Sequence, residues 1–496
     1  MMSAQQKEAT LNWYREQLTV PADHLKRIAD AFQSELEKGL ADESSLLMIP
    51  TMVDILPQGH ESGEYYAIDL GGTNLRVLYV RLGAQPKSVE AEAIHSSQVP
   101  PELQSAPVEE LMNYVVDHIV QWSQHAGCSM LERPEPVIGF CFSFPVEQAS
   151  VNSGKLLRWT KGYTNPGAVG QDPAKLLAEA FRRKDIQANI GALINDTVGV
   201  LAAVRYIDGT DTFASVIMGT GTNACYIEQL GRITKWLPHY RPRTPDMVVN
   251  IEWPGFQATE LPVLDEDRQL DEDSSNTGEQ CFEKLTAGLY MGDIARRIIL
   301  RCVENGELFG GSVPKKMRVM EQFETRFMAV SAQDDTPDLS ATAGVLSEAF
   351  GMEAGSIDHS DLQEVKQICS LVSVRSARLI AAAMCGILAH LQRDKPRQEG
   401  EAPPRSCIAV DGGVLVRYKF YRELLVQGVR EILGDAVADQ FQLKVVPGGS
   451  AFGAACMAAA TTGYMKSMGS PRGQGQKIKF PPRRLSATSL NMLGSS

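Results

Sequence analysis

Apolar side chains recur at spacings of three and four along several stretches of the chain, and this period is typical of amphipathic helices. It predicts a helix over residues 8–40, with a break before Ala22, and a regular helix over 108–122. Residues 173–183 predict a shorter helix. The long and increasingly alanine-rich segment 364–391 predicts a helix packed inside the protein.

Short apolar runs bounded by turn residues predict buried strands between these helices. The runs lie at residues 65–68, 75–80, 137–144, 190–194 and 407–410. A glycine-rich turn joins the first two of them. Segment 68–74 is echoed by 217–223, and both copies lie between runs of strand-forming residues. The echo suggests two lobes built on one plan, although seven residues are weak evidence of a duplication.

Composition adds a size and a compartment to this picture. A chain of 496 residues is longer than one hydrophobic core usually supports, so two lobes are expected. The net charge of -12 argues against general nucleic-acid binding, which favours a basic surface. The nine cysteines have no C-x-x-C spacing, and several lie in apolar runs, as reduced thiols do. We expect a cytoplasmic protein without a membrane span, because no apolar stretch approaches about 18 residues.

Two charged segments are expected to lie on the surface. The acidic run at residues 265–273 predicts a solvated loop. Residues 466–496 carry six lysines or arginines and no acid, with glycine, proline and serine throughout. This composition is typical of a disordered basic tail. A last helix of small residues is predicted at 452–460, before the tail.

Three glycine turns, at Asp69–Thr73, Gly219–Thr222 and Gly448–Ser450, are candidates for binding phosphate groups. Glycine lets the backbone approach phosphate oxygens, and threonine or serine hydroxyls add hydrogen-bond donors. Asp69 is placed to hold Mg2+ through water, because this ion prefers a carboxylate together with phosphates. A structural hairpin would explain any one turn alone. The chain contains neither a G-x-x-x-x-G-K-[ST] loop nor the H-R-D and D-F-G pair of protein kinases.

Polar residues near strand ends are candidates for binding a polyhydroxylated molecule, whose hydroxyls need paired donors and acceptors. These residues are Ser143, Thr160, Lys161, Asn195, Asp196, Asn223, Glu252 and Glu283. Asp196 follows the strand at 190–194 and is placed to accept a proton in a cleft, although Asn-Asp pairs commonly form turns. Glu252 and Glu283 can each accept from two neighbouring hydroxyls, but Glu283 fits a surface helix position equally well.

Several of these segments resemble the motifs of the eukaryotic hexokinase family and occur in the family's order. The run 68–77 resembles its first phosphate motif, and 139–145 with 159–163 resembles its sugar-binding segment. The runs similar to the remaining blocks are 193–199, 218–226, 252–253 and 280–284. Together the motifs span residues 20–462, and the sequence is most similar to plant and algal members.

The resemblance implies an α/β fold of two actin-like, ribonuclease H-like duplicated lobes with a cleft between them. It implies an N-terminal lobe over 8–207 and a C-terminal lobe over 208–465, ahead of the tail. The implied activity is ATP-dependent phosphorylation of a hexose at its 6-hydroxyl, with Mg2+. We expect glucose, fructose and mannose as candidate substrates, no nucleic-acid partner, and a monomer or weak homo-oligomer.

The resemblance also implies a role for each candidate residue. Asp196 is expected to be the catalytic base, and Lys161 to support the charge that develops beside it. The residues expected to hold the sugar are Ser143, Thr160, Asn195, Asn223, Glu252 and Glu283. The residues expected to hold the phosphates and Mg2+ are Asp69, Gly71, Gly72, Thr73, Asn74, Arg76, Gly221 and Thr222. Those expected near the nucleoside are Asp411, Gly413 and Ser450.

Some positions depart from the family pattern. Gly448 and Ala451 replace the ends of a usual Asp-Gly-Ser-Gly turn, which predicts weaker ATP binding. Pro254 stands where glycine is customary, which predicts a tilt of the loop carrying Glu252. Tyr163 replaces a usual phenylalanine, as a packing change. Two alternatives stay open: a sugar-binding sensor that has lost turnover, and an actin- or chaperone-like ATPase, which would leave the sugar-facing blocks without a purpose.

Overall fold

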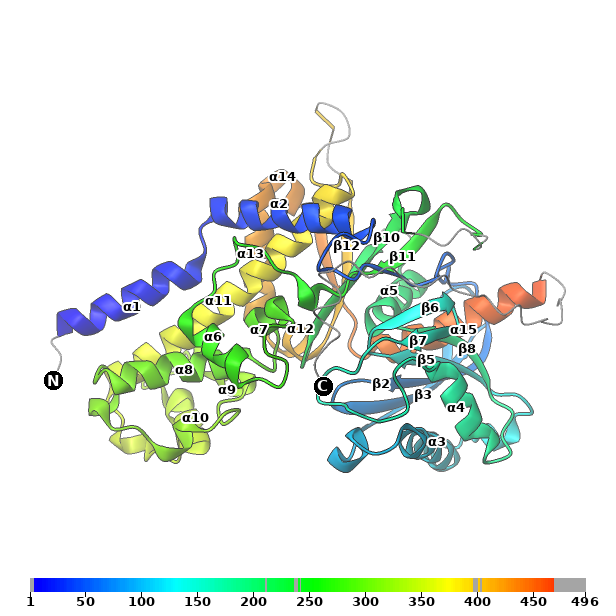
Figure 1. Cartoon of the computed structure of the whole chain (residues 1–496), viewed down its shortest axis with the longest axis horizontal. Coiled ribbons are helices and arrows are strands. Elements are labelled where there is room, and N and C mark those ends of the chain that lie inside the picture. Colours follow the sequence, from blue (N-terminus) through cyan, green and yellow to red (C-terminus); the bar gives the residue numbers. More distant parts are fainter. Residues whose placement is uncertain are drawn as a thin grey trace.

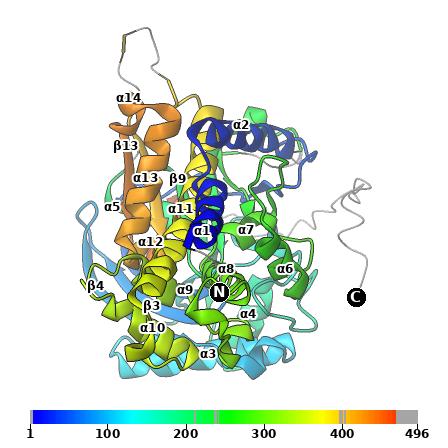
Figure 2. The same ribbon diagram turned by 90° about the vertical axis from the view of Figure 1, so that its left-hand side faces the viewer.

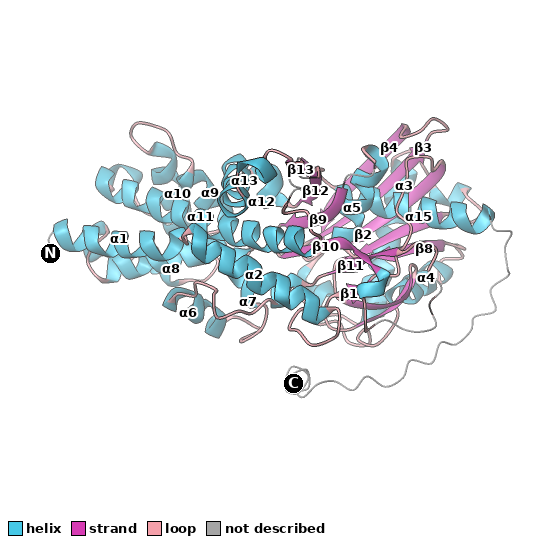
Figure 3. Ribbon diagram, turned by 90° about the horizontal axis from the view of Figure 1, so that it is seen from above, coloured by secondary structure: helices cyan, strands magenta, loops and turns pink. Residues whose placement is uncertain are grey.

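The computed structural model describes residues 4–209, 212–235, 240, 242–395, 400–401 and 404–467. Two sheets form the cores of two lobes that lie side by side (Figure 1). Seen from above, the strands fill the half of the molecule away from the N-terminus, and a helical region of the larger lobe fills the other half (Figure 3). The prediction of a two-lobed α/β fold is confirmed.

The smaller lobe has a five-stranded sheet in the order β4-β3-β2-β5-β8. The strands are β2 Gly63–Leu70, β3 Asn74–Leu82, β4 Val89–Gln98, β5 Val137–Phe142 and β8 Asn189–Ile194. A separate hairpin consists of β6 Val146–Ser150 and β7 Ser153–Leu156. One face of the sheet packs on α3 Val108–His125 and α4 Pro173–Arg182, and the other on α5 Asp196–Ile207 and α15 Gly449–Ser467.

The larger lobe has a six-stranded sheet in the order β1-β11-β10-β9-β12-β13. The strands are β1 Ile49–Pro50, β9 Thr212–Met218, β10 Thr222–Gln229, β11 Asp246–Asn250, β12 Ser406–Asp411 and β13 Phe441–Val445. In each sheet three antiparallel strands are followed by two parallel ones, so β4-β3-β2-β5-β8 corresponds to β11-β10-β9-β12-β13. The echo between residues 68–74 and 217–223 therefore marks equivalent hairpins of two lobes with one plan.

The helical region of the larger lobe is built around α11, His359–His390. The helices before it are α1 Ala4–Thr19, α2 Ala22–Gly39, α6 Asp265–Asp273, α7 Cys281–Thr286, α8 Met291–Glu304, α9 Thr325–Ala332 and α10 Ser340–Phe350. Those after it are α12 Gly413–Arg417, α13 Lys419–Leu433 and α14 Asp435–Ala438. Among the described residues, α11 alone is long and apolar enough to cross a membrane, but 89% of its most apolar window is buried inside the protein. It is the core helix that the sequence predicts.

The first helices of the chain pack in the larger lobe, and the last described helix packs in the smaller lobe. Helix α2 and strand β1 belong to the larger lobe, and α1 lies along α11 (Figure 2). Helix α15, near the other end, packs in the smaller lobe against α5 and strands β2, β5 and β8. The boundaries 8–207 and 208–465 stay a prediction about the linear chain, because in space the packing crosses that division at both ends.

Several expected elements have different bounds or surroundings. Helices α1 and α2 meet at Val20 and Pro21, where the predicted break lies. The last helix begins at Gly449 rather than at residue 452, so the third glycine turn forms its first turn. Residues 468–496, nearly all of the predicted tail, lie outside the described residues. All nine cysteines are free, and most of them are buried.

The prediction of a solvated acidic loop at residues 265–273 is wrong. The run is helix α6, and its Asp267 carboxylate is buried against Arg375 of α11, with nitrogen–oxygen distances of 2.6 and 2.8 Å. Glu266 is buried as well, and it accepts hydrogen bonds from Tyr14 at 2.7 Å and Arg301 at 2.8 Å. These carboxylates are tolerated in the interior because each is paired with a donor from a distant segment.

Candidate active site

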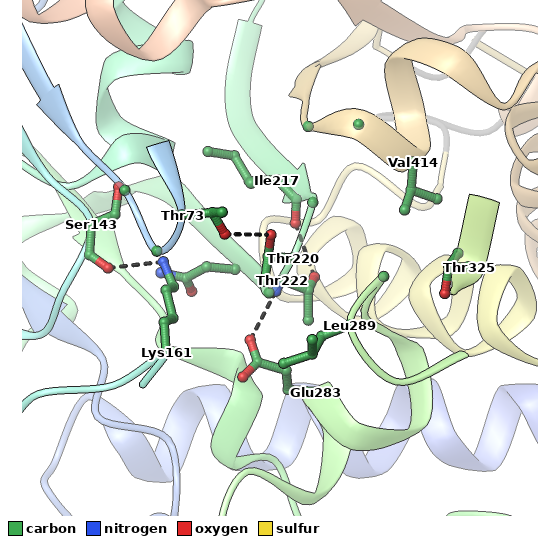
Figure 4. A pocket seen from close by; sticks show the side chains of 18 of the residues that line it. Thr73, Ser143, Lys161, Ile217, Thr220, Thr222, Glu283, Leu289, Thr325 and Val414 are labelled. Carbon is green, nitrogen blue, oxygen red and sulfur yellow. Dashed lines mark hydrogen bonds between the residues drawn. The ribbon is translucent and has the colours of Figure 1, made fainter. Parts of the chain in front are cut away.

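A cavity of about 940 Å3 opens between the loops of the two sheets. Figure 4 shows part of its wall. All the individual residues that the resemblance implies as catalytic or binding residues lie on this wall. They are Asp69, Gly71, Gly72, Thr73, Asn74, Arg76, Ser143, Thr160, Lys161, Asn195, Asp196, Gly221, Thr222, Asn223, Glu252, Glu283, Asp411, Gly413 and Ser450. Their individual roles stay predictions, but the fold brings them together.

Two glycine turns, one from each lobe, meet at the middle of the cavity. The β2–β3 turn is closed by a hydrogen bond of 3.0 Å from Gly71 N to Asn74 O. The hydroxyls of Thr73 and Thr220 lie 3.5 Å apart across the lobes, as Figure 4 shows. A side chain on Gly72 would meet Lys161, because its Cβ would lie 2.8 Å from Lys161 Cδ. The turns therefore present backbone and hydroxyl donors to one shared space.

Asp69 is held in place by several neighbours at this end of the cavity. Its Oδ2 atom accepts from Arg76 Nη1 at 3.0 Å and from Ser450 Oγ at 2.7 Å. The buried hydroxyl of Ser450 is thus bonded to Asp69, and the expected place of Ser450 near the nucleoside stays a prediction. Asp411 lies close enough to repel Asp69, and burial raises the pKa of the Asp411 carboxyl above its ordinary value. Two carboxylates therefore share one guanidinium here, which is a surrounding that suits a cation.

Asp196 is the first residue of α5, a helix that packs against both sheets. Asn195 caps this helix, because its side chain accepts from Thr197 N at 3.0 Å and Thr197 Oγ1 at 2.7 Å. Lys161 Nζ lies 3.9 Å from Asp196 Oδ2 and donates to Ser143 O at 2.9 Å. Lys161 has a φ of 57°, a left-handed conformation that side chains adopt rarely, so its position is set by the surrounding loop.

Two amides and a carboxylate of the larger lobe form a hydrogen-bond network at another part of the cavity wall. Asn223 Nδ2 donates to Glu252 Oε1 at 3.0 Å and to Asn250 Oδ1 at 2.9 Å. Asn250 Nδ2 donates to the same Glu252 oxygen at 2.7 Å. Glu252 is thus fixed by two amides, and burial raises its pKa above the ordinary value. Glu252 and Pro254 both lie on the cavity wall, and the tilt of this loop stays a prediction.

Glu283 is a buried residue of the cavity wall and not a surface residue, since only 5% of it is exposed. Its Oε2 atom accepts from Thr222 N at 2.9 Å, and burial raises the pKa of its carboxyl to about 7. The Thr222 hydroxyl is occupied within the protein, where it donates to Ile217 O at 3.0 Å and accepts from Trp253 Nε1 at 3.0 Å. Thr220 is therefore the better candidate for a phosphate-binding hydroxyl on this turn.

The far end of the cavity is a slot that sequence reasoning did not find. Helix α9 lines it with Thr325, Ala329, Val330 and, just past its end, Gln333. Helix α12 lines it with Val414, Arg417 and, just past its end, Tyr418. Leu289 and Val330 are unusually exposed for large apolar side chains, at 41% and 46%. The spacing of four along α9 could have indicated a helix face, but nothing in it distinguishes a cavity wall from a packed one.

The structure shows the surroundings of three positions that depart from the family pattern. Gly448 and Ala451 are not on the cavity wall, and Ala451 is completely buried in the core of the smaller lobe. The structure therefore gives no reason for weaker ATP binding at these positions. Tyr163 packs between Phe144 and Trp159 as a phenylalanine would, and its buried hydroxyl has no hydrogen-bond partner in the described structure.

Comparison with known proteins agrees with this geometry. Models of the hexokinase family match residues 10–206 and 213–460. Hexokinase-2 of Oryza sativa subsp. japonica is 38% identical over 464 residues, which cover 93% of this chain and 92% of that protein. Hexokinase-1 of Nicotiana tabacum is 39% identical over 462 residues and covers 92% of each chain. The structure of a Schistosoma mansoni hexokinase complexed with glucose matches with a TM-score of 0.81 and 28% identity, over 92% of this chain and 100% of that one.

The duplicated lobes and the shared cavity define a two-lobed sugar kinase. The chain belongs to the hexokinase family and is a hexose phosphotransferase with ATP as the phosphate donor.

Proposed function

We propose that the chain transfers the terminal phosphate of ATP to the 6-hydroxyl of glucose and related hexoses, with Asp196 as the general base. The observation that carries this proposal is the meeting of Asp196 and Lys161 with fixed carboxylates and amides on one cavity, beside two glycine turns. A sugar needs such acceptors and donors in pairs, and a triphosphate needs the amides and hydroxyls of the turns.

Asp196 accepts the proton of the hexose 6-hydroxyl as that oxygen forms a bond to the γ-phosphorus. The bond between the γ-phosphorus and the oxygen that bridges it to the β-phosphorus breaks, and the products are hexose 6-phosphate and ADP. Lys161 Nζ lies 3.9 Å from Asp196 Oδ2, where its ammonium stabilises negative charge on the transferring group.

The sugar is held from both lobes. Glu252 and Glu283 of the larger lobe accept hydrogen bonds from its hydroxyls, and Ser143 and Thr160 of the smaller lobe complete the pairs. Since Asn223 and Thr222 already fix the two carboxylates, little conformational entropy is lost when the sugar binds.

The phosphate end suits Mg2+. Asp69 is the carboxylate we assign to it through water, and no group of three or more His, Cys, Asp or Glu side chains within the described residues could hold a metal by itself. That set fits an ion that takes most of its ligands from phosphates and water. Bound Mg2+ would neutralise phosphate charge during transfer. The slot between α9 and α12 then takes the nucleoside, whose flat base matches apolar walls.

An assay that couples ADP release to a spectroscopic signal, with ATP and glucose, fructose or mannose, tests this proposal. Asp196→Ala is expected to lower kcat by about 10²-fold or more while glucose still binds. Asp208→Asn is the matched control, since Asp208 lies at the opposite end of α5. A variant at Asp196 with most of its kcat would refute the assignment of the base. Glucose binding without turnover in the native protein would favour the sensor alternative.

A further inference from the structure

Two charged side chains form an ion pair between the lobes, beside the cavity, and neither has a role in the chemistry above. Arg158 follows β7 on the smaller lobe, and Glu279 precedes α7 on the larger lobe. Arg158 Nη1 lies 3.7 Å from Glu279 Oε2, and about a third of each side chain is exposed. This ion pair joins segments that are 121 residues apart in the sequence and belong to different lobes.

Each partner lies beside residues of the proposed hexose site. Arg158 is followed by the cavity residues Thr160 and Lys161, and Glu279 is followed by Gln280 and Glu283. The field of the Arg158 guanidinium also reaches into the site, since it lowers the pKa of Glu252 against the stronger effect of burial. The pair is therefore close to the sugar end of the cavity.

Both partners lie on segments that are held by hydrogen bonds within their own lobe. On the larger lobe, Glu279 N donates to Asn276 O at 3.1 Å, and the nearly buried Lys284 ammonium holds the same carbonyl at 2.7 Å and pairs with Asp271. On the smaller lobe, Leu157 N donates to Pro145 O at 2.9 Å. A contact between two braced segments constrains the distance between them more than a contact between loose loops would.

That distance matters because the hexose site is divided between the lobes. Glu252 and Glu283 stand on one side, and Ser143, Thr160 and Lys161 on the other. A sugar that bonds to both sides loses hydrogen bonds when the gap widens, because these bonds weaken steeply with distance and misalignment.

We propose that Arg158 and Glu279 are a positioning pair that holds the two halves of the hexose site at their working separation. The proposal rests on the proposed function, because it assumes a hexose between these walls. The pair sets hexose affinity and leaves the affinity for ATP and the phosphoryl transfer step unchanged.

The test is a double-mutant cycle with Arg158→Gln, Glu279→Gln and both together, read as the dissociation constant of glucose in the absence of ATP. Intrinsic fluorescence is a suitable probe, because Trp159 follows Arg158 directly and Trp253 follows Glu252. Each single change is expected to weaken glucose binding about two- to fivefold, the range for a partly exposed pair. The double variant should be no weaker than either single one, and the exchange Arg158→Glu with Glu279→Arg should restore binding.

Arg268→Gln is the matched control, since Arg268 forms a more exposed pair with Asp265, at 2.7 Å, within α6 of the larger lobe. It should change neither binding nor melting temperature. The KM for ATP should stay constant in all variants. Additive losses, unchanged glucose affinity in the single variants, or a parallel rise in the KM for ATP would each overturn the positioning pair while the enzyme remains a hexokinase. A native protein that binds no hexose would overturn the proposed function and the pair with it.

Discussion

The proposed role of Glu283 in binding the hexose predicts that hexose affinity depends on pH, in the direction set by the raised pKa of its carboxyl. The carboxyl is buried among Asp196, Glu252 and the single ammonium of Lys161, and burial raises its pKa to about 7. Burial raises the pKa of the Tyr290 phenol, and the negative charge of Glu283 adds to that effect. Thr222 N already donates to one of the Glu283 oxygens, so the ionised form leaves the second oxygen free to accept from a sugar hydroxyl.

The magnitude follows from the fraction of the site that is ionised. If only ionised Glu283 binds glucose, the apparent dissociation constant is the intrinsic constant divided by that fraction. With a pKa of about 7, the fraction is about one eleventh at pH 6, one half at pH 7 and nine tenths at pH 8. Glucose should therefore bind about five- to sixfold more tightly at pH 7 than at pH 6, and affinity should level off above pH 8.

Glu283→Gln should remove this dependence and weaken binding about tenfold at neutral pH. The amide oxygen of the new side chain can still accept from Thr222 N, which turns its NH2 group toward a sugar hydroxyl that also donates. Titration calorimetry of glucose binding between about pH 5.5 and 8.5, without ATP, measures both effects. A flat profile in the native protein, or the same profile in the variant, would refute the reasoning.

Three further changes have effects that the packing determines. Tyr163→Phe removes a buried hydroxyl that has no partner in the described structure. Chemical denaturation should therefore show a free energy of unfolding that is unchanged or higher by up to about 1 kcal/mol, and a decrease would mean that the hydroxyl is bonded. Asp267→Asn leaves the Arg375 charge poorly paired, so the free energy of unfolding should fall by about 3–5 kcal/mol and the melting temperature should fall with it. If the Arg417 guanidinium stacks on the base, Arg417→Leu should raise the KM for ATP about threefold or more at constant kcat. Arg326 lines the same slot but pairs with Glu324 and Glu348, so Arg326→Leu should leave the KM for ATP unchanged.

The sequence predicted the parts of the site whose function imposes a local pattern. The turn at Asp69–Thr73 needs glycines beside strand ends, and Asp196 needs a helix that begins where a buried strand stops, so short motifs carry both signals. Thr220 and Thr222 show the limit of such motifs. Both belong to one turn, and only the structure shows that the Thr222 hydroxyl is bonded to Ile217 and Trp253 whereas the Thr220 hydroxyl meets Thr73 of the other lobe.

Long-range partners account for the features that the sequence did not predict. The acidic run at 265–273 has the composition of a solvated loop, but two of its carboxylates are buried. Arg375 and Tyr14 pair with them from positions 108 residues after Asp267 and 252 residues before Glu266. No local rule reveals partners at such separations. The same holds for Ser450, whose hydroxyl bonds to Asp69 only because α15 returns to the smaller lobe at the end of the described chain.

The charges at the two ends of the cavity differ, and each set of charges favours a different kind of ligand. At the sugar end three carboxylates surround one ammonium, a surplus of acceptors that a neutral ligand rich in hydroxyl donors can satisfy without adding charge. At the phosphate end Asp69 and Asp411 share Arg76, so the surroundings remain negative and a bare triphosphate would be repelled. A divalent cation that accompanies the triphosphate removes this repulsion. Under the proposed function, these charges favour a neutral acceptor at one end and a metal-bound donor at the other, as phosphoryl transfer to a sugar requires.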